Sequence, residues 1–190
     1  RPQDLKRSWD NDFIKEKKGM FEIKNVYRQA LPATRFIGRK YSDADRVNGS
    51  FANKWGEWFS QGYFETLEQL TIPEPFFEDS DAYIGLMRWK EGEPFEYWIG
   101  MFRPKDTPVP AGFDFVDFPE STLGVVWLYG KEGNLYSHED ACGNTLVQRG
   151  ETVITDVQGA LWFFERYACP RFTTPDELGN VVLDICYFIK

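Results

Sequence analysis

Hydrophobic and polar residues alternate along several short segments of the chain, and a period of two predicts β-strands. These segments are residues 21–26, 34–41, 82–89, 95–102, 113–118, 123–130, 161–167 and 181–189. Residues 21–41 are predicted to be one long strand, interrupted near Pro32 by a bulge or an edge position, because proline has no amide hydrogen to donate.

One stretch follows a helical period instead. Its large apolar residues recur at i, i+4, i+7 and i+8, which is typical of a helix packed on a sheet; they are Phe51, Trp55, Trp58, Phe59, Tyr63, Leu67 and Leu70. Asn48 or Ser50 is predicted to cap this helix, and Pro73 and Pro75 to end it.

A second helix is predicted to start at residues 137–140, with Ser137 as its cap. It should include Leu146 and Val147, although glycine and β-branched residues weaken the helical pattern over residues 141–160. His138, the only histidine, is expected on the surface at this helix start.

The order strand, helix, strand, strand thus occurs twice. It predicts an α+β fold of duplicated β-α-β-β modules, with mostly antiparallel sheets that are each covered on one face by a helix. Residues 1–20 are predicted to be a charged leader, and residues 21–190 one domain, with module one at 21–105 and module two at 110–190.

Aromatic residues make up 17% of the chain, with 7 Trp, 9 Tyr and 17 Phe among 190 residues. One core hardly needs so many rings, so the surplus indicates a pocket or an interface lined by aromatic faces. The net charge of −8 disfavours direct binding of nucleic acid and favours cationic ligands. The acidic surface could equally serve only solubility.

The remaining composition narrows the function classes further. No apolar run is long enough to span a membrane. The three cysteines are widely spaced and contain no Cys-x-x-Cys pair, which favours a reducing, cytoplasmic location. A single histidine argues against a Ser-His-Asp triad and a histidine metal site, so we expect no metal and no cofactor.

The run at residues 161–167 contains one carboxylate, Glu165, on the same strand face as Phe163 and Tyr167. A buried charge without a partner is costly, so Glu165 should have one. Two alternatives stay open: a rim position paired with Arg166 or Arg171, or a pocket position that receives a cationic ligand.

Another strand acid, Asp184, shares a face with Val182, Cys186 and Phe188. It is expected to be an edge carboxylate, with a second pocket acid as the alternative.

Three segments resemble the GyrI-like small-molecule-binding family, which also provides effector-binding domains of AraC- and MerR-type multidrug regulators. They are residues 96–101 followed by 108–119, with the sequence Val109-Pro110-Ala111-Gly112-Phe113; the Phe163–Tyr167 strand; and the terminal strand at 183–189. The resemblance spans about residues 21–190. It implies two β-α-β-β modules of the SHS2 type, related by a pseudo-twofold axis, with a ligand channel between them.

Two features depart from the family pattern. Residues 137–160 lack its compact aromatic helix, and residues 1–20 contain no recognisable helix-turn-helix. A regulatory role would therefore need a DNA-binding domain or regulator partner supplied from elsewhere.

The resemblance implies that Glu165 is the pocket glutamate. The ligand-binding residues that it suggests are Glu165, Phe163, Tyr167, Tyr83, Tyr97, Trp98 and Trp127. Taken singly, each of these rings is more often a core residue than a ligand contact. Burial would raise the pKa of the Glu165 carboxyl, and a bound cation would stabilise its anion. Each cation–π contact would add about 0.5–2 kcal/mol.

Three functions follow, in order of preference. The first is binding of lipophilic cationic or planar aromatic small molecules. The second is hydrolysis of cyclopropane-bearing alkylators, with Glu165 activating water and Tyr167 as a proton donor. The third is effector sensing for a transcription regulator.

Overall fold

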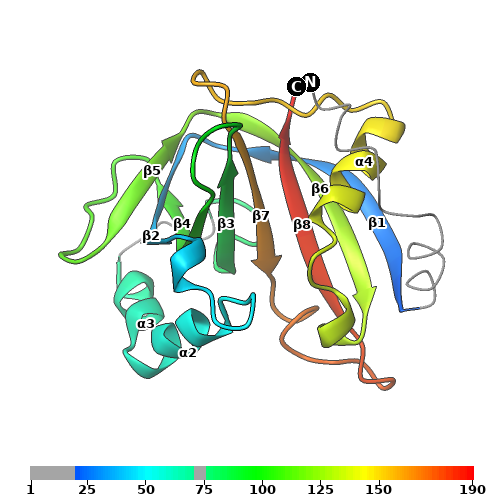
Figure 1. Ribbon diagram of the computed structural model, residues 1–190, viewed down its shortest axis with the longest axis horizontal. Coiled ribbons are helices and arrows are strands. Elements are labelled where there is room, and N and C mark those ends of the chain that lie inside the picture. The colour runs from blue at the N-terminus through cyan, green and yellow to red at the C-terminus, as the bar shows by residue number, and fades with distance from the viewer. Residues whose placement is uncertain (1–19, 71–75) are drawn as a thin grey trace.

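The alternating segments form eight strands of one antiparallel sheet (Figure 1). The computed structural model describes residues 20–70 and 76–190. The strands are β1 (Phe21–Leu31), β2 (Thr34–Tyr41), β3 (Tyr83–Trp89), β4 (Glu96–Pro104), β5 (Asp114–Phe118), β6 (Ser121–Gly130), β7 (Leu161–Tyr167) and β8 (Val181–Ile189). The predicted α+β class with antiparallel strands is confirmed. The predicted leader, apart from residue 20, and the helix-ending prolines 73 and 75 lie outside the described residues.

The strands follow the order β1-β6-β8-β7-β3-β4-β2-β5. Exchanging β1 with β5, β2 with β6, β3 with β7 and β4 with β8 turns this order into its own reverse. This is the order that a duplication would produce, and the duplicated modules with their pseudo-twofold symmetry stay a prediction.

The prediction of one long strand over residues 21–41 is wrong. β1 ends at Leu31 and pairs with β6, whereas β2 starts at Thr34 and pairs with β4 and β5. Only Pro32 and Ala33 separate two strands from opposite ends of the strand order. The sheet must therefore curve until its two ends converge there, and Pro119–Glu120 connects β5 to β6 in the same way (Figure 1).

Each face of the curved sheet carries its own core, because successive side chains of a strand point to opposite sides. One face packs under α2 (Ala52–Ser60), α3 (Tyr63–Glu68) and α4 (Glu139–Gln148), and we call it the helix-bearing face. Its core includes Ile37, Trp58 and Leu183. The opposite face carries a second core that includes Phe102 and Phe164.

The single helix predicted at residues 48–70 is two helices, because Gly62 adopts a left-handed conformation (φ 69°) between them. The predicted cap is partly right: the Ser50 hydroxyl accepts a hydrogen bond from the Ala52 amide, although Phe51 holds the N-cap position. Among residues 20–70 and 76–190, no helix combines the length and apolar character that crossing a membrane requires.

The predicted helix near residue 137 is α4, and it includes Leu146 and Val147 as expected. Its cap is His138 rather than Ser137. The surface position predicted for His138 is wrong: the imidazole is buried, and its ring centroid lies 4.2 Å from that of Phe21.

Candidate functional site

Glu165 lies on β7, in the middle of the sheet, between Gly85 of β3 and Ile185 of β8. Its side chain is on the helix-bearing face, together with Phe163 and Tyr167, as alternation along β7 requires. Only 6% of the residue is exposed. The carboxyl group is therefore shielded from water.

The hydrogen-bond partners of Glu165 are tyrosine hydroxyls. Tyr97 donates to Oε1 at 2.6 Å and Tyr167 donates to Oε2 at 3.0 Å. The indole Nε1 of Trp55 donates to the Tyr97 oxygen at 2.9 Å. Neutral donors stabilise a carboxylate less than a charged guanidinium does. Within residues 20–70 and 76–190, no cationic side chain pairs with this carboxyl.

The pKa of the Glu165 carboxyl rises to about 7, mainly because burial removes water from its anion. The hydroxyl of Tyr97 opposes this rise, the negative charge of Glu139 adds to it, and the hydroxyl of Tyr167 opposes it. Burial also raises the pKa of Glu139, the first residue of α4. Near neutral pH, both protonation states of Glu165 are therefore populated.

Gly85 provides the space for this carboxyl. A Cβ atom at position 85 would lie 2.6 Å from Glu165 Oε1 and 2.6 Å from the Tyr97 hydroxyl. Both distances are far below van der Waals contact, so any larger residue would push these two groups apart.

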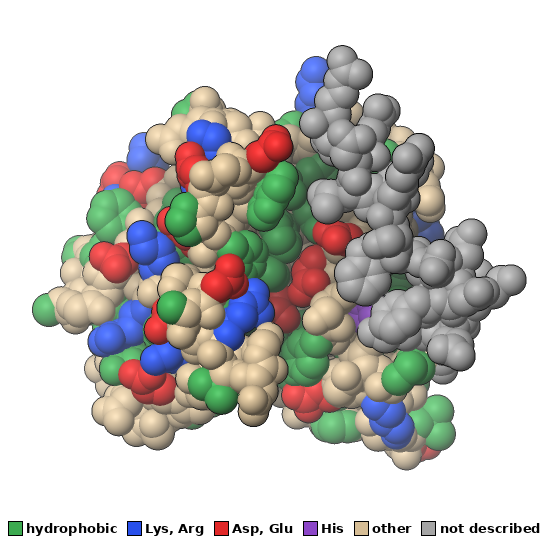
Figure 2. Space-filling model, in the orientation of Figure 1, with side chains coloured by type: hydrophobic (Ala, Val, Ile, Leu, Met, Phe, Trp, Pro, Cys, Tyr) green, Lys and Arg blue, Asp and Glu red, His purple; other side chains and the backbone are tan. Residues whose placement is uncertain are grey.

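Aromatic rings surround the hydrogen-bonded group. Phe51 stacks on Tyr97 with centroids 4.2 Å apart, and Trp55 meets Tyr167 edge-on at 4.9 Å. Phe172 packs against the other side of Tyr167 at 4.7 Å. Figure 2 shows this face hollowed between the α2–α3 side and the α4 side, with acidic side chains inside the hollow.

The structure brings together some of the rings suggested by the sequence. Phe163, Tyr97 and Tyr167 lie on the helix-bearing face with Glu165. Tyr83 lies on the same face but packs on α3, where it stacks on Phe64 at 3.7 Å and donates to Glu68.

Trp98 and Trp127 pack on the opposite face of the sheet. Trp98 follows Tyr97 and Trp127 follows Val126, and both Tyr97 and Val126 point to the helix-bearing face. Because side chains alternate along a strand, both tryptophans point away from Glu165. They do not belong to the cluster around the carboxyl.

Several members of the cluster were not singled out as site residues in the sequence. Gly85, in the interior of β3, is a recognisable signal of close approach by another group. Trp55 and Phe51 belong to the helical stripe, which only indicates packing on a sheet. Glu139 has no local signal, because its position depends on how α4 lies over β8.

The edge position predicted for Asp184 is wrong. β8 lies between β6 and β7, and Asp184 is completely buried on the opposite face. Arg166 and Arg171, the two arginines considered as partners of Glu165, form ion pairs with Asp184 instead.

Two surface hollows lie away from Glu165. The larger, about 370 Å³, includes Lys40, Tyr41 and Glu96 in its lining, and the smaller, about 190 Å³, includes Lys24 and Tyr129. The predicted ligand channel between modules therefore stays a prediction.

No protein-family model and no curated protein matches the chain. Solved structures do share its fold. The structure of SAV2435 bound to tetraphenylphosphonium has a TM-score of 0.61 and 14% identity, over 88% of this chain and 94% of that one.

Two further structures are similar. A putative bacterial transcription regulation protein from Staphylococcus aureus MU50 has a TM-score of 0.58 and 15% identity, over 87% of this chain and 98% of that one. The EcmrR C-terminal domain has a TM-score of 0.57 and 10% identity, over 87% of this chain and 97% of that one. At such identities the similarity establishes a shared fold alone.

Proposed function

We propose that this chain binds lipophilic cations with aromatic groups, as a GyrI-like effector-binding domain, and that Glu165 is the counter-ion of the ligand. The observation that carries this proposal is a buried carboxyl whose direct partners, Tyr97 and Tyr167, are both uncharged.

A cation would gain from this arrangement in two ways. A unit charge at about 4 Å from a carboxylate is worth about 4 kcal/mol at an effective dielectric constant of 20. The rings around the carboxyl add cation–π contacts of about 0.5–2 kcal/mol each. Since the pKa of Glu165 is about 7, ionising it at neutral pH costs little.

A ligand has to displace part of the cluster to reach the carboxyl. Both carboxyl oxygens are occupied by hydroxyls, and Trp55 holds the Tyr97 hydroxyl in place. Trp55 and its neighbour Phe51 belong to one short segment at α2. Movement of this segment would uncover Tyr97 and Glu165 together.

The fold comparison supports the chemical class of the ligand. SAV2435 is described in complex with tetraphenylphosphonium, a permanent cation enclosed by four phenyl rings. This is the kind of molecule that a carboxylate surrounded by aromatic faces would select.

Tryptophan fluorescence with tetraphenylphosphonium as the quencher tests the proposal, because Trp55 belongs to the cluster. We expect saturable binding by the wild type and an affinity at least about tenfold lower for Glu165→Gln, since glutamine has no charge to attract the cation and a charge pair at about 4 Å is worth about 4 kcal/mol at an effective dielectric constant of 20. Glu96→Gln, which changes a β4 carboxylate 3.7 Å from Lys40, is the matched control. Equal affinity of wild type and Glu165→Gln would contradict the proposal.

Hydrolysis of cyclopropane-bearing alkylators is a second candidate, favoured by the carboxyl pKa of about 7, which suits a general base. The water oxygen would bond to a ring carbon as a carbon–carbon bond of the cyclopropane breaks, and Glu165 would take the proton that this water loses. Tyr167, whose hydroxyl lies 3.0 Å from Glu165 Oε2, would protonate the released side of the opened ring and recover a proton from Glu165. Turnover of such an alkylator that is lost in Glu165→Gln would support it. Binding without turnover would contradict the hydrolase role.

The third candidate is effector sensing within a transcription regulator. One of the similar structures is described as a putative bacterial transcription regulation protein. In this role a DNA-binding domain or partner would respond to occupation of the Glu165 site. A change in DNA affinity of that partner on adding tetraphenylphosphonium would support the role, and no change would contradict it.

A further inference from the structure

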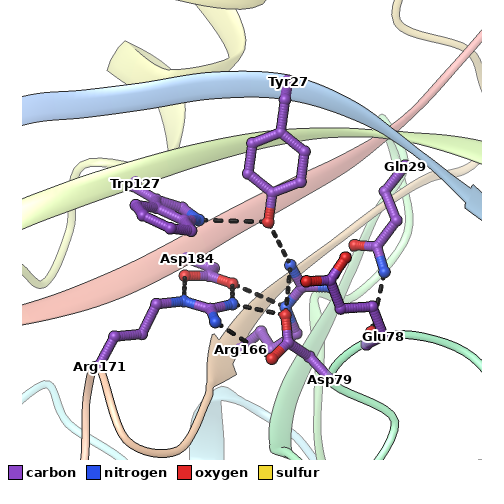
Figure 3. Close-up of polar contacts among 8 residues, drawn as sticks. All are labelled: Tyr27, Gln29, Glu78, Asp79, Trp127, Arg166, Arg171 and Asp184. Atoms are coloured by element: carbon purple, nitrogen blue, oxygen red, sulfur yellow. Dashed lines mark hydrogen bonds and ion pairs between the residues drawn. The ribbon is translucent and has the colours of Figure 1, made fainter. Parts of the chain in front are cut away.

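A cluster of buried charges lies on the opposite face of the sheet from Glu165 (Figure 3). We call it the four-ion cluster: Asp79, Arg166, Arg171 and Asp184. Arg166 donates from Nε to Asp184 Oδ2 at 2.7 Å, and Arg171 donates from Nε to Asp184 Oδ1 at 2.9 Å. Arg171 also donates to both carboxylate oxygens of Asp79, at 3.1 and 2.7 Å. The four charges balance, which such deep burial requires.

Arg166 and Asp184 belong to strands, but Arg171 lies in the segment that connects β7 to β8. Its guanidinium lies 4.8 Å from the ring centroid of Trp127, on the opposite face. Backbone hydrogen bonds shape this turn: the Arg171 carbonyl accepts from the Val182 amide and the Phe172 amide donates to the Ala168 carbonyl, both at 2.8 Å, and the Thr174 amide donates to the Pro170 carbonyl at 2.9 Å. The ion pairs of Arg171 add a side-chain connection from this turn to Asp79 and to Asp184 of β8.

The next residue, Phe172, packs with the core of the helix-bearing face. Its ring meets Tyr167 edge-on at 4.7 Å, and Tyr167 donates to Glu165 Oε2. Two consecutive residues of one turn thus reach both faces of the sheet. Arg171 lies on the face opposite Glu165, and Phe172 lies on the helix-bearing face.

Resting on the proposed function, we propose that Arg171 is a positioning residue of the Glu165 site. Its ion pairs with Asp79 and Asp184 hold the turn so that Phe172 supports the Tyr167 ring, which keeps the Tyr167 hydroxyl on the carboxyl of Glu165. Arg171 does not touch the ligand.

The chain offers a way to separate this role from a general loss of stability. In Arg171→Gln, Asp184 keeps its bond to Arg166, and Arg166 also lies 3.6 Å from Asp79. Arg35→Gln is a matched control, because Arg35 donates to both oxygens of Asp117 at 2.7 and 2.9 Å. The two arginine side chains are similarly exposed, at 18% and 16%.

The first measurement needs no ligand: the pKa of the Glu165 carboxyl, followed by carbon-13 NMR in the free protein. The titratable groups around this carboxyl are Tyr97 of β4, Tyr167 of β7, Glu139 of α4, and Tyr136, which precedes α4. Loss of the Tyr167 hydrogen bond should raise the pKa by about half a unit to one unit in Arg171→Gln. Arg35→Gln should leave it unchanged.

A Tyr167→Phe background separates positioning from the loss of a distant positive charge. There, Arg171→Gln should no longer shift the Glu165 pKa, because the hydroxyl through which it acts is gone. The same shift in both backgrounds, or no shift in either, would overturn the proposal. If Arg171→Gln does not fold, Phe172→Leu should raise the Glu165 pKa in the same direction, and no shift there would also overturn it.

The second measurement is the affinity for tetraphenylphosphonium at pH 7, which should fall about two- to fivefold in Arg171→Gln, because a pKa raised by half a unit to one unit leaves less of the Glu165 carboxyl ionised. Arg171→Lys, which keeps the charge but cannot bridge both carboxylates, should recover part of it. A pKa shift in a protein that never binds the cation would refute the proposed function and leave the positioning role standing. Unchanged affinity for the cation together with an unchanged Glu165 pKa would refute the positioning role and leave the proposed function standing.

Discussion

Two acids on neighbouring strands, Glu165 and Asp184, are both buried but have different partners. Asp184 is paired in register with Arg166, and Glu165 is paired with the next residue of β8, Ile185. Asp184 receives two arginines and is neutralised, whereas Glu165 receives two tyrosine hydroxyls and keeps an unbalanced charge. Burial without a paired cation therefore raises the pKa of the Glu165 carboxyl to about 7.

This difference predicts how stability depends on pH. The folded-state pKa of Glu165, about 7, lies above the ordinary value of 4.5, so its stabilising contribution is complete below pH 4.5 and is lost as pH rises through 7. Glutamine stays neutral throughout. Glu165→Gln should therefore match the wild type at pH 4 and exceed its free energy of unfolding at pH 8 by on the order of 3 kcal/mol.

Urea unfolding of both proteins between pH 4 and pH 9 measures this difference. Glu96→Gln, at the end of β4 near Lys40, controls for a general change of charge. A difference between wild type and Glu165→Gln that does not vary with pH would contradict the assigned pKa.

Gly85 carries a second prediction at this scale. Gly85→Ala should lower the free energy of unfolding by about 1–3 kcal/mol, because the added methyl group collides with Glu165 and Tyr97. Gly56→Ala, in α2 where nothing lies within 4 Å of the added Cβ, should instead raise it by about 0.5–1 kcal/mol. Denaturant unfolding compares the two, and equal effects would refute the close-packing account of Gly85.

The sequence indicated Glu165 correctly as an isolated acid among rings, because strand alternation fixes its neighbours on β7. It could not identify Tyr97 as the closest partner, since Tyr97 lies on β4, two strands away. That contact depends on the register of β7 with β3 and of β3 with β4, which no local pattern encodes.

At the scale of elements, alternation located the strands well but their connections poorly. Residues 21–41 have the pattern of one strand, and nothing local shows that the chain changes pairing partners at Pro32. The helical stripe likewise continues through Gly62, although the backbone breaks there. The edge position predicted for Asp184 is wrong because the alternation of residues along β8 does not show whether this strand lies at the edge or in the interior of the sheet.

The interior position of β8 makes Asp184 important for stability. Asp184→Asn should lower the free energy of unfolding by about 3–5 kcal/mol, because it leaves Arg166 and Arg171 with too little negative charge in a buried position. Asp117→Asn removes an acid that is 51% exposed at β5 and should cost less than about 1 kcal/mol. Thermal or urea unfolding tests both, and a small effect at Asp184 would contradict the role of the four-ion cluster.

At the scale of the whole molecule, the sheet joins its two halves at the β7–β3 pair. Glu165 and Gly85 lie opposite each other in this pair, and the helices cover the sheet on either side of it (Figure 1). The proposed site therefore belongs to neither half alone. A single sequence predicts the elements of each half, but the meeting of β7 and β3 results from long-range pairing and curvature.

Proton release on ligand binding tests the central claim most directly. Calorimetric titration with tetraphenylphosphonium at pH 7, in buffers of different ionisation enthalpy, counts the protons exchanged. Because the carboxyl of Glu165 has a pKa of about 7 and a bound cation stabilises its anion, the wild type should release about half a proton per ligand. Glu165→Gln should release none and bind more weakly. Equal affinity and no proton release in either protein would contradict the assignment of Glu165 as the counter-ion.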